Sequence, residues 1–135
     1  MIVDTSALVA IVTGEPGYER LLDAILVDAD PAVPASCLLE AHMVIRSRFP
    51  PAMLETLDAT VAGLRLRVVP FTEAQSALAS AAFDRYGRGR HPARLNFGDC
   101  MAYAAAEAEG APLLFVGEDF SRTDIVAAAQ DSASG

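Results

Sequence analysis

Hydrophobic positions along the chain fall into short apolar runs and longer stretches with helical spacing. The runs at residues 1–3, 66–69 and 113–116 end at an acid, a proline and a glycine respectively, and they predict short buried strands. Apolar residues three and four positions apart predict the helices, which we place at residues 5–12, 16–26, 35–49, 54–64, 72–86 and 96–109.

Glycine, proline and capping residues mark the boundaries of these elements. Residues 30–34 contain two prolines and predict a loop, and residues 87–92 predict another. The residues expected to cap, start or break helices are Gly14, Pro16, Pro50, Pro51, Thr72 and Asn96.

Strands that alternate with helices predict an α/β fold in which a central parallel β-sheet is flanked by α-helices on both faces. We expect one domain over residues 1–130 and a frayed polar tail over residues 131–135. Ligands of such sheets bind beyond the carboxyl ends of the strands. The residues just after Val3 and Val116 are therefore the first candidates for a site.

Composition narrows the class of protein. The chain has 135 residues, is 53% hydrophobic and has a mean hydropathy of +0.31, which excludes disorder as its main state. No apolar run approaches the roughly 20 residues of a membrane span, and the first residues lack a basic segment, so we expect a cytoplasmic protein without a signal peptide. Cys37 and Cys100 have no close ligand repeat and predict buried small side chains rather than a zinc site.

The net charge of −8 argues against a general nucleic-acid coat protein. The basic charge is concentrated, because lysine is absent and four of the ten arginines lie within ten residues. We predict a phosphate-binding loop there, with ordinary solvated surface charge as the alternative. Its members are Arg85, Arg88, Arg90, His91 and Arg94, and the neighbouring rings Tyr86, His91 and Phe97 are candidates for stacking on an unpaired base.

Two acids stand at predicted element boundaries. Asp4 follows the first strand directly, where its alternative role is to cap a helix. Asp99 lies in the first turn of its helix, where it could instead complete a capping box with Asn96. Gly98 beside it leaves room for a phosphate or a metal ion.

Glu40 is the most informative acid because it lies in a nearly apolar helical stretch. Its neighbours three and four residues away carry no positive charge, so no local ion pair is available. Such a carboxylate is paired from elsewhere, neutralised or bound to a metal, unless it lies on a narrow solvent-facing stripe.

The last loop supplies the fourth acid. Asp119 is our choice, ahead of Glu118 and then Asp124. Carboxylates that converge at one end of a sheet form an all-oxygen site of the kind that Mg²⁺ or Mn²⁺ prefers. Without a cation, the same carboxylates would repel one another and their pKa values would rise.

The segments 2–8, 95–99 and 113–120, together with Glu40, resemble the motifs of PIN domains, and the resemblance extends to the VapC toxins of toxin–antitoxin pairs. It implies an endoribonuclease dependent on Mg²⁺ or Mn²⁺, with Asp4, Glu40, Asp99 and Asp119 as catalytic and metal-binding acids and Thr5 or Ser6 as the supporting hydroxyl. It also implies tRNA or rRNA as substrate, a cognate VapB-like antitoxin and a homodimer. The last motif departs from the family, which often has Thr or Ser and then Asp or Asn where this chain has Phe115 and Gly117.

Two other readings compete with the nuclease. Phosphoryl-transfer domains of the receiver or dehalogenase type are also acid-lined and parallel, but both need a lysine near the acids and this chain has none. A PIN-like binding module that has lost catalysis is the non-enzymatic alternative.

Overall fold

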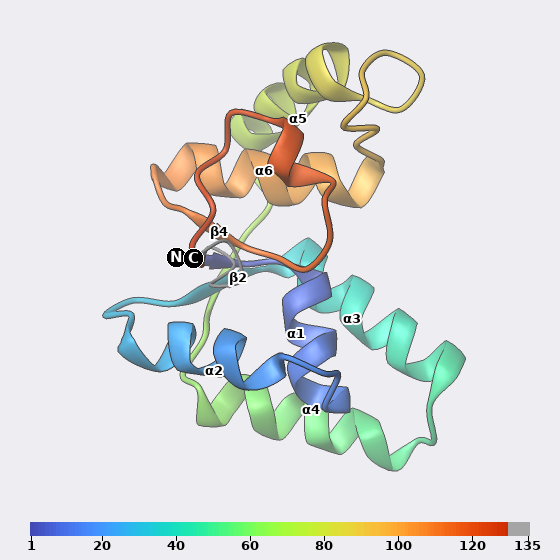
Figure 1. The fold of residues 1–135 in the computed structure, drawn as a ribbon, viewed down its shortest axis with the longest axis vertical. Coiled ribbons are helices and arrows are strands. Elements are labelled where there is room, and N and C mark those ends of the chain that lie inside the picture. The colour runs from blue at the N-terminus through green and yellow to red at the C-terminus, as the bar shows by residue number, and fades with distance from the viewer. Residues whose placement is uncertain (130–135) are drawn as a thin grey trace.

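A computed structural model describes residues 1–129 and shows a three-layer α/β fold (Figure 1). The central sheet has four parallel strands in the order β3-β2-β1-β4. The predicted fold class is therefore confirmed. The predicted tail at residues 131–135 lies outside the described residues.

Short strands and longer helices alternate along the chain. The strands are β1 (Ile2–Val3), β2 (Ala32–Pro34), β3 (Arg67–Val69) and β4 (Leu113–Leu114). The helices are α1 (Thr5–Thr13), α2 (Tyr18–Val27), α3 (Ala35–Arg48), α4 (Ala52–Gly63), α5 (Glu73–Tyr86) and α6 (Phe97–Glu109), followed by a 3-10 turn, η1 (Phe120–Arg122).

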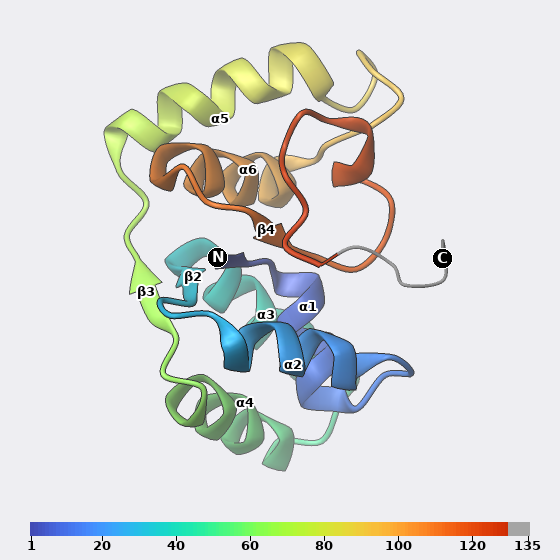
Figure 2. The same ribbon diagram turned by 60° about the vertical axis from the view of Figure 1, so that its left-hand side comes forward.

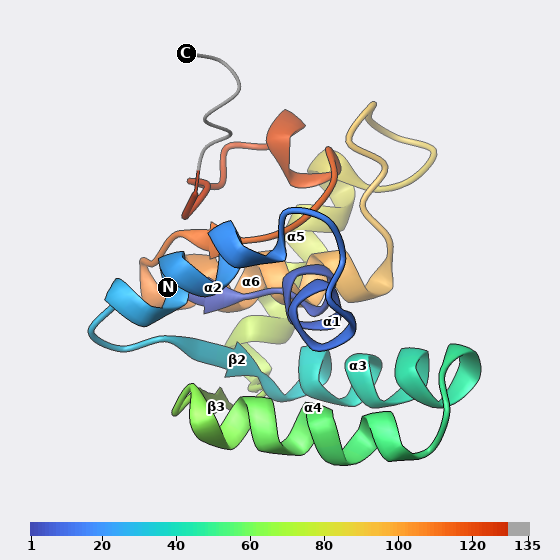
Figure 3. The same cartoon turned by 60° about the horizontal axis from the view of Figure 1, so that its bottom comes forward.

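Helices cover both faces of the sheet. Helix α6 packs on one face and α5 lies outside it, while α1, α2 and α4 lie on the other side (Figures 1 and 2). Helix α3 leaves the carboxyl end of β2 and contacts both α1 and α6 (Figure 3). No described helix is long and apolar enough to cross a membrane.

The core consists of side chains from both strands and helices. Its largest fully buried members include Ile2, Leu8, Ile45, Leu57, Leu95 and Leu113. Both cysteines are buried and unpaired, as predicted. At the edge of the sheet, the Arg67 guanidinium binds both Asp30 and Glu109 at 2.9 Å, which ties β3 to the segment before β2 and to the end of α6.

Two local predictions are wrong. The segment predicted as a loop at residues 30–34 contains β2, which pairs with β1 on one side and β3 on the other. Pro31 still supplies a carbonyl to the backbone N–H of Arg67, and Pro34 ends the strand, so neither proline breaks the ladder. Pro16 lies in the turn before α2, not in its first turn.

The two faces of α3 differ in burial. Ile45 is fully buried, whereas Leu39 on the same helix is 62% exposed. We expect Ile45→Ala to lower the free energy of unfolding by about 2–5 kcal/mol, and Leu39→Ala to change it by less than about 1 kcal/mol. Urea unfolding followed by circular dichroism measures both. Equal losses would show that α3 packs through a different face.

Candidate functional site

Three of the predicted acids face one pocket at the carboxyl end of the sheet. Asp4, Glu40 and Asp99 come from the end of β1, the first half of α3 and the first turn of α6. The acidic pocket, as we call it, has a volume of about 260 Å³. Its lining residues are Asp4, Thr5, Ser6, Val9, Glu15, Glu40, Val44, Arg48, Asn96, Asp99 and Val116.

Asp4 is the most deeply buried acid, with 5% of its surface exposed. Its Oδ2 accepts hydrogen bonds from the Ser6 N–H at 3.0 Å and the Ser6 hydroxyl at 2.6 Å, and it caps α1. The Cys37 thiol makes a weak contact with its Oδ1 at 3.9 Å. Burial raises the pKa of Asp4 despite the Ser6 hydrogen bonds, and the Glu40 charge raises it further.

Ser6 and Thr5 have different supporting roles. The Ser6 hydroxyl donates to Asp4 and accepts the Val116 N–H at 3.0 Å, so it joins α1 to the segment after β4. The Thr5 hydroxyl donates to the Cys37 carbonyl at 3.1 Å and thereby joins α1 to α3. Ser6 therefore positions the acid directly, whereas Thr5 fixes the neighbouring helix.

Asp99 both caps its helix and faces the pocket. It forms a reciprocal capping box with Asn96, with backbone-to-side-chain distances of 2.9 and 3.1 Å. Burial, followed by the charges of Asp4, Asp119 and Glu40, raises the pKa of Asp99 to about 6. Asp99 can therefore cap α6 and line the acidic pocket at the same time.

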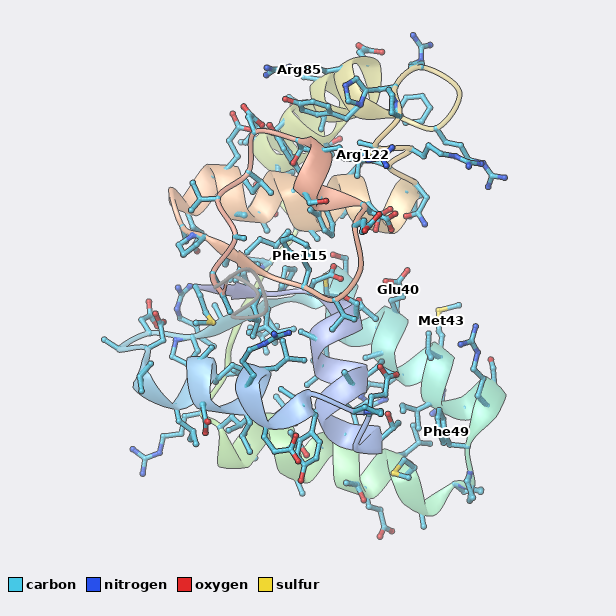
Figure 4. The ribbon with its side chains drawn as sticks, in the orientation of Figure 1. Glu40, Met43, Phe49, Arg85, Phe115 and Arg122 are labelled. Atoms are coloured by element: carbon cyan, nitrogen blue, oxygen red, sulfur yellow. The ribbon has the colours of Figure 1, made fainter. Side chains whose placement is uncertain are left out.

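Glu40 reaches toward α6 because Gly98 has no side chain. A Cβ built at Gly98 would lie 2.6 Å from Oε2 of Glu40, closer than real contacts allow. We expected the gap at Gly98 to admit a phosphate or metal, but the Glu40 carboxylate already lies against it. Glu40 makes no ion pair or hydrogen bond with any of residues 1–129, and Figure 4 shows it beside the end of the sheet.

Asp119 lies at the start of η1 and is exposed, outside the lining of the acidic pocket. Its charge nevertheless contributes to the raised pKa of Asp99, so the two carboxylates are near each other. Phe115 packs against the buried Phe120 with ring centroids 5.2 Å apart, and this contact anchors the turn that carries Asp119.

Asp124 contacts residues outside the acidic pocket. It accepts a short hydrogen bond from the Tyr103 hydroxyl and pairs with Arg85 at 3.4 Å. The Tyr103 hydroxyl lowers the pKa of Asp124, and Arg85 contributes to the same effect. This engagement disfavours Asp124 as the fourth acid of the pocket.

The arginines of the predicted phosphate-binding loop lie in different surroundings. Arg85 pairs with Asp124 and stacks over Tyr86, and Figure 4 places it well away from Glu40. Arg88, Arg90 and Arg94 are exposed on the loop before α6 but do not line the acidic pocket. Backbone hydrogen bonds beside the bridge between Gly87 and Leu95 hold the base of the loop. A side chain at Gly87 would collide with Phe83, because a Cβ there would lie 2.4 Å from the Phe83 carbonyl oxygen.

The three candidate stacking rings differ in their exposure. Tyr86 is buried, and His91 packs edge-on against it at 5.1 Å. Phe97 is 81% exposed at the start of α6, two residues before Asp99.

Sequence reasoning missed two charged residues of the acidic pocket, Glu15 and Arg48. The spacing Glu40, Val44, Arg48 follows one face of a helix at four-residue intervals and could have revealed Arg48. Glu15 lies in the turn after α1, where no periodicity indicates its direction.

The donor set fits a hard divalent cation in its chemistry, because carboxylate oxygens dominate and the nearby Cys37 thiol is buried with its pKa raised to about 12. The acids are not arranged as a finished metal centre, since no three His, Cys, Asp or Glu side chains in the described part converge closely enough.

Gly98→Ala tests the contact between α6 and Glu40. The added methyl group displaces the Glu40 carboxylate, so we expect the affinity for Mn²⁺ to fall about tenfold while the fold is kept. Gly63→Ala is the matched control, because a Cβ there meets nothing within 4 Å. Calorimetric titration measures both, and an unchanged affinity in Gly98→Ala would remove Glu40 from the metal site.

Asp99→Asn tests the cost of charging Asp99 in the metal-free protein. The folded protein holds the Asp99 proton to about pH 6, above the unfolded value of about 4, so its stability falls as the pH rises between these values. The variant should be more stable than the wild type by about 1 kcal/mol at pH 8, because it removes a charge that is partly buried and close to other acids, and equal to it below pH 4. Thermal unfolding in EDTA across this range measures the difference. A difference independent of pH would contradict the raised pKa of Asp99.

Comparison with known proteins gives consistent results. The PIN domain family model matches residues 1–126. Ribonuclease VapC of Mycolicibacterium smegmatis is 43% identical over 127 residues, which cover 94% of this chain and 98% of that protein. Ribonuclease VapC36 of Mycobacterium tuberculosis is 44% identical over 126 residues, 93% of this chain and 91% of that protein.

Solved structures share the fold at lower identity. A Mycobacterium tuberculosis VapC20 structure, described as a sarcin–ricin loop cleaving toxin, aligns with a TM-score of 0.76, 18% identity and coverage of 93% and 95% of the two chains. A Rickettsia felis VapBC2 structure bound to promoter DNA aligns with a TM-score of 0.74, 18% identity and coverage of 93% and 94%.

Proposed function

We propose that this chain, which belongs to the PIN-domain family and within it to the VapC ribonucleases, is a toxin that hydrolyses phosphodiester bonds of structured RNA as a divalent-metal-dependent endoribonuclease. The observation that carries the proposal is the gathering of Asp4, Glu40 and Asp99 from three separate elements into one pocket. Burial raises the pKa values of Asp4 and Asp99, and the charges of neighbouring acids raise them further, so a bound cation would stabilise the ionised carboxylates.

A metal ion bound by these acids would activate a water and neutralise charge on the phosphate. Mg²⁺ or Mn²⁺ is the cofactor we propose, with Asp4 and Asp99 as core ligands and Glu40 and Asp119 as further ligands or water-holding groups. Ser6 supports Asp4 by occupying Oδ2, which leaves Oδ1 facing away from the serine. The capping box holds Asp99 in the first turn of α6.

The substrate is proposed to be RNA with an exposed single-stranded loop, tRNA first and rRNA second. Phe97 offers an exposed ring beside Asp99 for an unpaired base. The exposed Arg88, Arg90 and Arg94 lie on the loop that leads to it and can contact the phosphates that flank the cleaved bond. His91 accepts a hydrogen bond from the Ala93 N–H at 3.0 Å, which favours a structural role in shaping this loop.

We propose a VapB-like antitoxin as the partner. An apolar groove of about 710 Å³ runs between α3 and the start of α6 and shares Glu40, Val44 and Arg48 with the acidic pocket. Its exposed apolar members are Leu39, Met43, Phe71 and Phe97. An amphipathic segment laid in this groove would cover the acids. The Klebsiella pneumoniae toxin–antitoxin complex shares the fold, with a TM-score of 0.71 and 15% identity. We also propose a homodimer and a cytoplasmic location.

Cleavage of total cellular RNA by the purified, antitoxin-free protein tests the proposal. With Mg²⁺ or Mn²⁺ we expect discrete fragments, which disappear in EDTA. Asp4→Asn should lower the rate at least about 100-fold, because it removes a buried ligand, whereas Asp23→Asn on the exposed side of α2 should not change it. Asp119→Asn and Glu118→Gln, compared in the same assay, identify the fourth acid, and we expect the loss in Asp119→Asn.

A folded protein that binds RNA but does not cleave it with either metal would favour the competing reading, a PIN-like binding module. Cleavage that persists in EDTA or in Asp4→Asn would show a contaminating nuclease or a different mechanism.

A further inference from the structure

Arg48 is the only cation among the described residues that line the acidic pocket. It lies in the last turn of α3, two turns after Glu40 and one after Val44, and all three side chains face the same pocket. At 1.5 Å per residue, its backbone is about 12 Å along the helix from that of Glu40. Arg48 forms no ion pair with the acids of the pocket among the described residues.

The acidic pocket repels the phosphates of an RNA strand, so binding of RNA there requires a nearby cation. Asp4, Glu15, Glu40 and Asp99 line it, in a chain whose net charge is −8. An RNA backbone that approaches this surface is repelled at every phosphate that no cation neutralises. A metal bound by the acids serves the cleaved phosphate, and the neighbouring phosphate needs a cation of its own.

Arg48 is free of carboxylate partners among the described residues and can bind a phosphate, unlike two other arginines. Arg67 is bound by two carboxylates, and Arg85 is bound by Asp124. The exposed Arg48 makes no ion pair or hydrogen bond with any residue that the structure describes. An uncommitted guanidinium can present two parallel N–H donors to a phosphate.

A plainer role for Arg48 is to complement the C-terminal end of the α3 dipole. Arg46 has that role equally, since it lies in the same last turn and is also exposed, but it does not line the acidic pocket. Comparing the two arginines therefore distinguishes the roles. Both lie at the end of the helix, and only Arg48 lines the acidic pocket.

We propose that Arg48 binds the RNA phosphate next to the cleaved one and so sets the register of the strand across the acidic pocket. This proposal rests on the nuclease function proposed above. Arg48 acts by binding and orienting the substrate and takes no part in proton transfer.

The test compares Arg48→Ala with Arg46→Ala, which carry the same net charge, in an Asp4→Asn background that prevents cleavage. The probe is a fluorescein-labelled RNA hairpin with a single-stranded loop, and its affinity is measured by anisotropy at several salt concentrations. We expect Arg48→Ala to weaken binding about tenfold and to reduce the slope of log K against log salt by about 0.7–0.9, the loss of one phosphate contact. Arg46→Ala should keep both values, and Arg48→Lys should recover the slope but only part of the affinity.

Equal affinities and slopes in Arg48→Ala and Arg46→Ala would overturn the proposal for Arg48, even if the wild-type protein cleaves RNA. Conversely, wild-type protein that binds the hairpin through Arg48 without cleaving it would refute the nuclease function and leave the phosphate contact standing. Circular dichroism melting of each variant shows that the fold is intact.

Discussion

The burial of Asp4 close to other carboxylates is the constraint on which the rest of this site depends. Burial raises the pKa of Asp4, and the Glu40 charge raises it further. The pKa of Asp99 is raised by burial and then by the charges of Asp4, Asp119 and Glu40. A protein of this size has only about 5–15 kcal/mol of stability with which to hold such a cluster. The contacts around Asp4 and Asp99 therefore hold charged side chains in place at a cost in stability, as is typical of functional sites.

Each of those contacts comes from a different part of the chain. Ser6 holds Asp4 and receives the segment after β4, Thr5 fixes α3, the Asn96 capping box fixes Asp99, and the bare backbone of Gly98 admits Glu40. Since these contacts join α1, α3, α6 and the end of β4, the geometry of the site depends on the complete fold.

The sequence was sufficient to predict what depends on local chemistry. Helix caps, three of the four strands, the parallel sheet and the gathering of Asp4, Glu40 and Asp99 follow from periodicity and from the order of elements. Strand β2 was missed because Pro31 and Pro34 flank it and three residues are too few to show alternation. The pairing of Arg85 with Asp124, the burial of Tyr86 and the direction of Arg48 depend on contacts between distant segments. The chemical identity of the residues does not reveal such contacts.

The double contact of Ser6 with a single oxygen of Asp4 has a consequence for ion selection. Because Oδ2 accepts both an N–H and an O–H, only Oδ1, which has the weak Cys37 contact, would be open to an ion. Ca²⁺ commonly takes both oxygens of a carboxylate at longer and more variable distances, whereas Mg²⁺ requires single oxygens in a compact octahedron. In the metal site proposed above, a serine two residues after the acid would thus favour the smaller ion.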